Sequence, residues 1–161
     1  METERMGRCA RLAWDHAVEA RPGGRIERPG VMTGHLLLGV LKEPDCAGGL
    51  ILAKMGLDLP LVLAHTEFAL LHGRSRDGVD DSPVDYAGVP HTRAARTVLD
   101  YALEEAALFS ATYPIGTEHI LLGLLRVPEG VGCRILGFFG ADEERARSTR
   151  DEFWEILRLE E

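Results

Sequence analysis

Apolar residues recur along this chain at the spacing of one face of an α-helix. A clear stripe is formed by Val98, Leu99, Ala102, Leu103 and Ala106. This spacing is typical of an amphipathic helix, and it predicts helices over about residues 5–20 and 92–109. No segment shows the sustained alternation of apolar and polar residues that is typical of half-buried strands. The chain is therefore predicted to be all-α.

An internal repeat explains why the pattern occurs twice. Residues 33–58 align without a gap on residues 117–142, with twelve identities in 26 positions. The identical pairs are Thr33/Thr117, His35/His119, Leu37/Leu121, Leu38/Leu122, Gly39/Gly123, Leu41/Leu125, Pro44/Pro128, Gly48/Gly132, Ile51/Ile135, Leu52/Leu136, Gly56/Gly140 and Asp58/Asp142. Such self-similarity indicates one supersecondary unit used twice.

Each copy is predicted to contain four helices. The second helix is expected to begin at Thr33 or Thr117, because a threonine hydroxyl is a good N-cap. The third is expected to end at Gly56 or Gly140, since glycine adopts the left-handed conformation of a helix C-terminus. An aspartate two residues later, Asp58 in the first copy, is expected to cap the fourth helix.

The predicted fold is therefore two tandem four-helix repeats with pseudo-twofold symmetry, about eight helices in all. The first repeat covers residues 1–72 and the second covers residues 91–161. Residues 73–90 are rich in Gly, Asp, Ser and Pro and are predicted to be a linker. We expect the two repeats to form one compact domain.

Composition and charge narrow the classes of partner. Apolar residues make up 45% of the chain and charged residues 27%, as in ordinary globular proteins. The formal net charge of -8 opposes binding to nucleic acid, which relies on clustered Lys and Arg. The chain begins without the apolar core of a signal peptide, and no stretch approaches the length of a membrane span. A cytoplasmic location without membrane contact is predicted.

The three cysteines, Cys9, Cys46 and Cys133, are widely spaced and form no C-x-x-C pair. That spacing matches neither a zinc site nor a redox motif. We expect them to be buried, reduced thiols.

The segment Ile115–Arg126, with the sequence IGTEHILLGLLR, resembles the signature of the Clp ATPase N-terminal repeat, as found in ClpC-type chaperones. With both repeats counted, the resemblance covers nearly the whole chain. It implies a double four-helix repeat that sits on a hexameric unfoldase and binds substrates, adaptors and arginine-phosphorylated proteins. Neither Lys42 nor Lys54 lies in the G-x-x-x-x-G-K-[ST] pattern of a P-loop. The ATPase modules are therefore expected to be absent, and no cofactor is expected.

Glu118 is the leading candidate for ligand binding. It follows Thr117 at a helix start, where free N–H groups can receive an anion, and its carboxylate can pair with a guanidinium. Phosphoarginine carries both groups. Alternatively, Glu118 only stabilises the helix start, by about 0.3 to 1 kcal/mol. In the first copy Gly34 takes this position, so a single ligand site is predicted, formed by Glu118 and Thr117, with Thr92 as a weaker candidate for a phosphate contact.

The histidines and hydroxyl groups do not form a recognisable catalytic pattern. His35 and His119 have no second ligand at helical spacing, so a structural role is favoured over a metal site. The sequence contains no G-x-S-x-G nucleophile elbow. The chain is accordingly predicted not to be an enzyme.

The sequence as a whole predicts a protein- or peptide-binding module that serves as an accessory, adaptor or competitor of a Clp chaperone-protease. Its expected partners are Clp-type ATPase or protease subunits and substrate or adaptor proteins, including arginine-phosphorylated proteins. Two alternatives stay open. One is a structural subunit that docks on the Clp protease core, and the other is an unrecognised small hydrolase or transferase.

Overall fold

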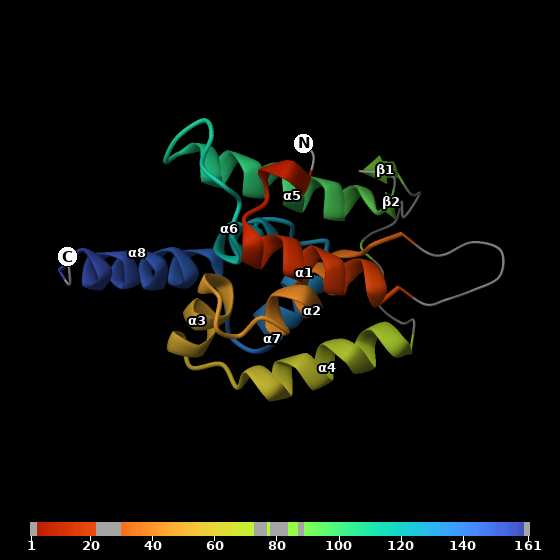
Figure 1. Ribbon diagram of the computed structural model, residues 1–161. Coiled ribbons are helices and arrows are strands. Elements are labelled where there is room, and N and C mark those ends of the chain that lie inside the picture. Colours follow the sequence, from red (N-terminus) through yellow and green to blue (C-terminus); the bar gives the residue numbers. More distant parts are fainter. Residues whose placement is uncertain (1–2, 22–29, 73–76, 78–83, 87–88, 160–161) are drawn as a thin grey trace.

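The computed structural model describes residues 3–21, 30–72, 77, 84–86 and 89–159 (Figure 1). These residues form a 3-10 turn at Thr3–Arg5, two short strands, β1 (Val84–Tyr86) and β2 (Val89–His91), and eight α-helices. The helices are α1 (Arg8–Glu19), α2 (Thr33–Leu41), α3 (Ala47–Lys54), α4 (Leu59–Leu71), α5 (Arg93–Ala107), α6 (Thr117–Leu125), α7 (Val131–Phe138) and α8 (Glu143–Leu159). The predicted all-α fold with four helices in each repeat is confirmed.

Helices α2 and α6 lie at the centre of the molecule. Every residue of both helices is buried, from Thr33 to Leu41 and from Thr117 to Leu125. Their apolar residues run around the whole circumference, which is typical of a helix covered on all sides. Helix α1 packs on α2, and α5 packs on α6. The hydrophobic stripes found in the sequence are the faces of α1 and α5 that make these contacts.

The two repeats are interlocked. Helix α3 of the first repeat packs on α6 of the second, and α7 of the second packs on α2 of the first. The segments that precede the helices also pair between the repeats. Before α1 and α6, Gly7 N–H donates to Ile115 O (2.8 Å), and before α5 and α2, Thr92 N–H donates to Val31 O (2.9 Å). The hydrophobic core is therefore shared between the repeats.

Close approach of helices explains the glycines in the middle of α2 and α6. A Cβ added at Gly39 would overlap the backbone carbonyl of Ala13 in α1, and one at Gly123 would overlap that of Val98 in α5. Gly56 and Gly140 have φ values of 92° and 85°, so the predicted left-handed ends of α3 and α7 are confirmed.

A small hairpin lies where the sequence predicts only a linker. Strands β1 and β2 pair antiparallel, with Val84 opposite His91 and Tyr86 opposite Val89. Strands of three residues are too short for alternation to be visible in the sequence. The rest of the predicted linker, apart from Asp77, lies outside the described residues.

The prediction of three reduced thiols is wrong for two of them. Cys9 and Cys46 form a disulfide with a Cα–Cα distance of 6.1 Å, although 37 residues separate them in sequence. Packing of the first three helices brings together the start of α1 and the start of α3. Cys133 is a free thiol, and burial raises its pKa.

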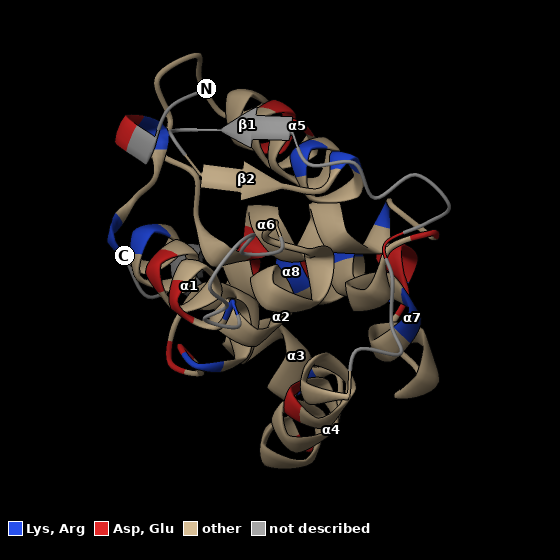
Figure 2. Ribbon diagram, turned by 90° about the vertical axis from the view of Figure 1, so that its right-hand side faces the viewer, with Lys and Arg blue, Asp and Glu red and all other residues tan. Residues whose placement is uncertain are grey.

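The surface differs strongly between helices. Helix α4 carries almost no charged residues, as its mostly tan colour in Figure 2 shows. Its exposed apolar side chains include Leu61, Phe68 and Leu71. In contrast, α8 is rich in charged residues and runs outward from the body to the C-terminus (Figure 1). No single helix among the described residues is long and apolar enough to cross a membrane; α3 and α4 pass that test only as a pair, bent by 111°.

Candidate functional site

The two equivalent threonines Thr33 and Thr117 do not cap their helices. The N-caps are Met32 and Gly116, and each threonine is the first helical residue. Each hydroxyl instead accepts a hydrogen bond across the repeat boundary. Thr117 Oγ1 accepts from Gly48 N–H at 2.8 Å, and Thr33 Oγ1 accepts from the N–H of Gly132 at 2.9 Å. The threonines therefore fix the start of α3 on α6 and the start of α7 on α2.

His35 and His119 do the capping that was predicted for the threonines. The N–H groups of Met32 and Gly116 each donate to the Nδ1 atom of the following histidine at 2.9 Å. An accepting Nδ1 belongs to a neutral ring that carries its proton on Nε2. Burial lowers the pKa of His35 to about 4, against an opposing effect of Asp77, and burial also lowers the pKa of His119. Both histidines thus have a structural role.

An aspartate fills the start of α2. The carboxylate of Asp77 is buried and accepts hydrogen bonds from Thr33 N–H (2.7 Å), Thr33 Oγ1 (2.6 Å), Thr92 Oγ1 (2.5 Å) and Val131 N–H (3.0 Å). Two of these donors are first-turn amides, of α2 and of α7, where helix dipoles favour an anion. We call these residues, together with Gly132, the α2-start cluster.

The start of α6 has the same framework without the aspartate. Ala47, Gly48 and Thr117 correspond in the repeat to Val131, Gly132 and Thr33 of the α2-start cluster. Among the described residues, neither the first-turn amides of Ala47 and Thr117 nor the Thr117 hydroxyl proton has an acceptor. With Glu118, these residues form the α6-start cluster. The donors of the α6-start cluster are equivalent in the repeat to those that bind the Asp77 carboxylate in the α2-start cluster.

Glu118 directly follows Thr117 in α6, and its carboxylate lies beside Gly116, the N-cap of that helix. Its residue is 7% exposed, and its carboxylate folds back so far over Gly116 that a Cβ there would overlap it. His119 Nδ1 lies 3.6 Å from the carboxylate, but that atom already accepts from Gly116 N–H, so the ring is neutral and does not pair with Glu118. No hydrogen-bond donor to Glu118 occurs among the described residues. A carboxylate in such a position can bind a cationic partner through charge-assisted hydrogen bonds.

The residues on either side of the equivalent threonines differ in size between the two repeats. The second repeat has Gly116 before its threonine and Glu118 after it, whereas the first has Met32 and Gly34. A Cβ at Gly34 would lie 2.9 Å from Leu70 Cδ2, so Leu70 of α4 fills the space beside it. The carboxylate and the room for it are thus present only at α6.

Thr92 lies in the other cluster. It caps α5 by accepting from Ala95 N–H, and its hydroxyl donates to Asp77. The structural counterpart of Thr92 beside α6 is Gly7, which has no side chain. Of the three predicted site residues, Thr117 and Glu118 are therefore brought together and Thr92 is not. Sequence reasoning missed Asp77 and the amides of Ala47 and Gly48, because nothing in the sequence marks them.

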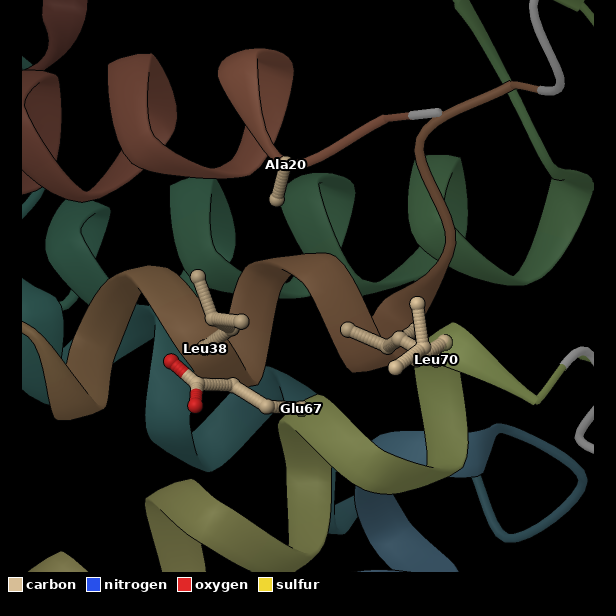
Figure 3. Close-up of a pocket in the computed structure, with 5 residues that line it drawn as sticks. Ala20, Leu38, Glu67 and Leu70 are labelled. Carbon is tan, nitrogen blue, oxygen red and sulfur yellow. The ribbon is translucent and has the colours of Figure 1, made fainter. Parts of the chain in front are cut away.

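A separate cleft of about 250 Å³ lies between the end of α1, α2 and α4 (Figure 3). Its lining consists of Ala20, Leu38, Glu67, Leu70 and Leu71. Glu67 is the only charged residue in this lining, so the cleft holds no acid–base pair. Within the described part of the chain, no three His, Cys, Asp or Glu residues are grouped in a way that could hold a metal ion.

Comparison with known proteins agrees with this architecture. Residues 90–159 match the family described as the Clp repeat (R) N-terminal domain. The ATP-dependent Clp protease ATP-binding subunit ClpC of Staphylococcus epidermidis is 30% identical over 146 residues, which are 91% of this chain and 16% of that protein. For ClpC of Staphylococcus aureus strain USA300 the identity is 31% over 147 residues, with the same coverage of 91% and 16%.

A solved structure shows the same fold. The N-terminal domain of the caseinolytic protease associated chaperone ClpD from Arabidopsis thaliana superimposes with a TM-score of 0.69 at 22% identity, covering 100% of this chain and 98% of that one. The described chain spans 16% of the length of the ClpC relatives. By its repeat, its fold and these relatives, the chain belongs to the Clp repeat N-terminal domain family.

Proposed function

We propose that this chain is a protein-interaction module of a Clp chaperone-protease system, that it acts by binding alone, and that its ligand binds at the α6-start cluster. The observation that carries the proposal is Glu118, a carboxylate in a residue only 7% exposed, with no donor among the described residues. The relatives named as ATP-binding subunits of an ATP-dependent Clp protease support placing its partners in that system. These partners are Clp ATPase or protease subunits, adaptors and substrate proteins.

The chemistry of the α6-start cluster favours arginine-phosphorylated proteins as ligands. A guanidinium can form paired, charge-assisted hydrogen bonds with the Glu118 carboxylate. The phosphate of the same residue can accept from the amides of Thr117 and Ala47 and from the Thr117 hydroxyl. The α2-start cluster supports this assignment, because the equivalent groups there already hold an anion, the Asp77 carboxylate.

The proposal includes a single site per chain. In the first repeat, Asp77 occupies the donors and Leu70 fills the space beside Gly34. Neither the phosphate position nor the guanidinium partner is therefore available at α2.

Calorimetric titration with a phosphoarginine peptide tests the proposal. The expected result is binding at one site per chain, weakened in Glu118→Ala by roughly ten- to a hundredfold, because loss of a charged hydrogen-bond partner costs about 1.5–3 kcal/mol. Glu129→Ala is the matched control, since Glu129 is an exposed glutamate of the same repeat. A peptide with unmodified arginine carries only the guanidinium, and one with phosphoserine carries only the phosphate, so these peptides test the two contacts separately. Binding that is indifferent to Glu118, or two equal sites, would refute the proposal.

A further inference from the structure

The two helix-start clusters are held together by different means. In the α2-start cluster, the Asp77 carboxylate joins the start of α5, through Thr92, to the start of α7, through Val131. The corresponding helices beside α6 are α1 and α3, and they are joined by the Cys9–Cys46 disulfide. A covalent bond thus stands where the other repeat uses an anion, and it leaves the donors of the α6-start cluster unoccupied.

Both cysteines lie next to residues that contact the start of α6. Cys9 is two residues after Gly7, whose N–H donates to Ile115 O at 2.8 Å. Cys46 is the N-cap of α3. It directly precedes Ala47 and Gly48, and Gly48 N–H donates to Thr117 Oγ1 at 2.8 Å. The disulfide therefore connects the two segments that flank the proposed ligand position.

We propose that the Cys9–Cys46 disulfide is a redox-sensitive clamp that holds the α3 start on the α6-start cluster, so that reduction loosens the cluster and weakens ligand binding. The effect on binding rests on the proposed function. Both cysteines are half-buried, which leaves them within reach of a small thiol. Without the bond, the start of α3 is held on α6 by helix packing and by the hydrogen bond from Gly48 to Thr117, because this cluster has no counterpart of Asp77 among the described residues.

The chemistry is thiol–disulfide exchange with a dithiol as reductant. One thiolate of the dithiol attacks the sulfur of Cys9 or Cys46, which forms a mixed disulfide and releases the other cysteine as a thiolate. The second thiol of the reagent then displaces the remaining cysteine and closes a cyclic disulfide. Two electrons and two protons pass from the reagent to the protein, which ends with two thiols. Burial raises the pKa of Cys133, and this disfavours the thiolate needed for it to compete in the exchange.

Amide hydrogen exchange followed by NMR tests the clamp in the ligand-free protein. After reduction with dithiothreitol, the Gly48 amide is expected to exchange at least about tenfold faster, whereas Gly132 in the α2-start cluster keeps its rate within about twofold. Cys46→Ser should match the reduced protein whether or not the dithiol is present, and Cys133→Ser should behave as the parent chain. Unchanged exchange of Gly48 overturns the proposal. Equal acceleration at Gly48 and Gly132 overturns it too, because that result means general loosening of the fold.

A second measurement links the clamp to the ligand. The affinity for a phosphoarginine peptide should fall about tenfold on reduction, and by linkage the peptide should make the disulfide harder to reduce by the same factor. Equal affinity in both redox states overturns the control of binding. If no peptide binds in either state while Gly48 still responds to reduction, phosphoarginine is the wrong ligand and the clamp stands.

Discussion

At the residue scale, the starts of α2 and α6 are organised by polar side chains that bind across the boundary between the repeats. Thr33 and Thr117 are important at the starts of α2 and α6, yet their hydroxyls bind the opposite repeat and the adjacent histidines do the capping. Local propensity predicts an N-cap threonine correctly only when no stronger distant partner competes for it. Thr92 does cap its helix, but its hydroxyl also donates to Asp77, which lies in a segment without any recognisable pattern, and Thr92 therefore belongs to the α2-start cluster.

His35 predicts a specific dependence of stability on pH. Burial lowers the folded-state pKa of His35 from 6.5 to about 4. The unfolded chain therefore takes up a proton below about pH 6.5, whereas the folded chain does not until about pH 4. This contribution to stability is complete above about pH 6.5 and is lost as the pH falls towards 4, with a total on the order of 3 kcal/mol.

Urea denaturation at a series of pH values measures this effect. His35→Gln keeps an acceptor for the N-cap amide but cannot titrate, so its stability should fall less between pH 6.5 and 4 than that of the parent chain. His72→Gln, at the exposed end of α4, is the control and should follow the parent curve. Identical slopes for His35→Gln and the parent chain would contradict the assigned role.

At the element scale, nearly all of the helical architecture is predictable, because each helix carries its own signals. The helical periodicity, the glycines with positive φ at 56 and 140 and the Asp58 cap of α4 are all local features, and all were found as expected. The hairpin formed by β1 and β2 was not, since two strands of three residues leave no periodic signal. The disulfide was also missed, because it depends on how α1 and α3 meet in space.

Two glycines in helices predict opposite effects of the same substitution. Gly39→Ala puts a methyl group against the Ala13 carbonyl at the crossing of α2 and α1, and should destabilise the fold by about 1–3 kcal/mol. A Cβ added at Gly137 in α7 would meet no neighbouring atom within 4 Å, so Gly137→Ala should stabilise by about 0.5–1 kcal/mol. Thermal unfolding of both variants measures the effects. Destabilisation of equal size at both positions would show that helix crossing is not what requires Gly39.

At the scale of the whole molecule, the interlocking of the repeats decides what the folding unit is. Helix α2 is buried from end to end by neighbours from both repeats, and α6 likewise. The ion cluster around Glu105 of α5, which is 3% exposed, binds Arg147 and Arg150 of α8 and so ties the first and last helices of the second repeat together. The sequence repeat reveals the duplication, but only the structure shows that each copy completes the core of its partner.

Separated repeats are therefore expected not to fold alone. A cut after residue 80 leaves fragments 1–80 and 81–161, and each loses the third helix that its central helix needs from the other half. Fragments of about 80 residues have marginal cores even when intact, and these would expose a large apolar face of α2 or α6. Circular dichroism should show little cooperative unfolding for either fragment. Mixing the two fragments in equal amounts should restore helicity and give a 1:1 complex. The hydrogen bonds of Thr33 and Thr117 across the repeats, and those between the segments that precede the helices, can form between two chains as they do within one. The full chain with a protease site inserted after residue 80, cleaved only after folding, is the control and should stay assembled. A cooperative transition in either isolated fragment, at a temperature close to that of the full chain, would show that one repeat is a domain in its own right.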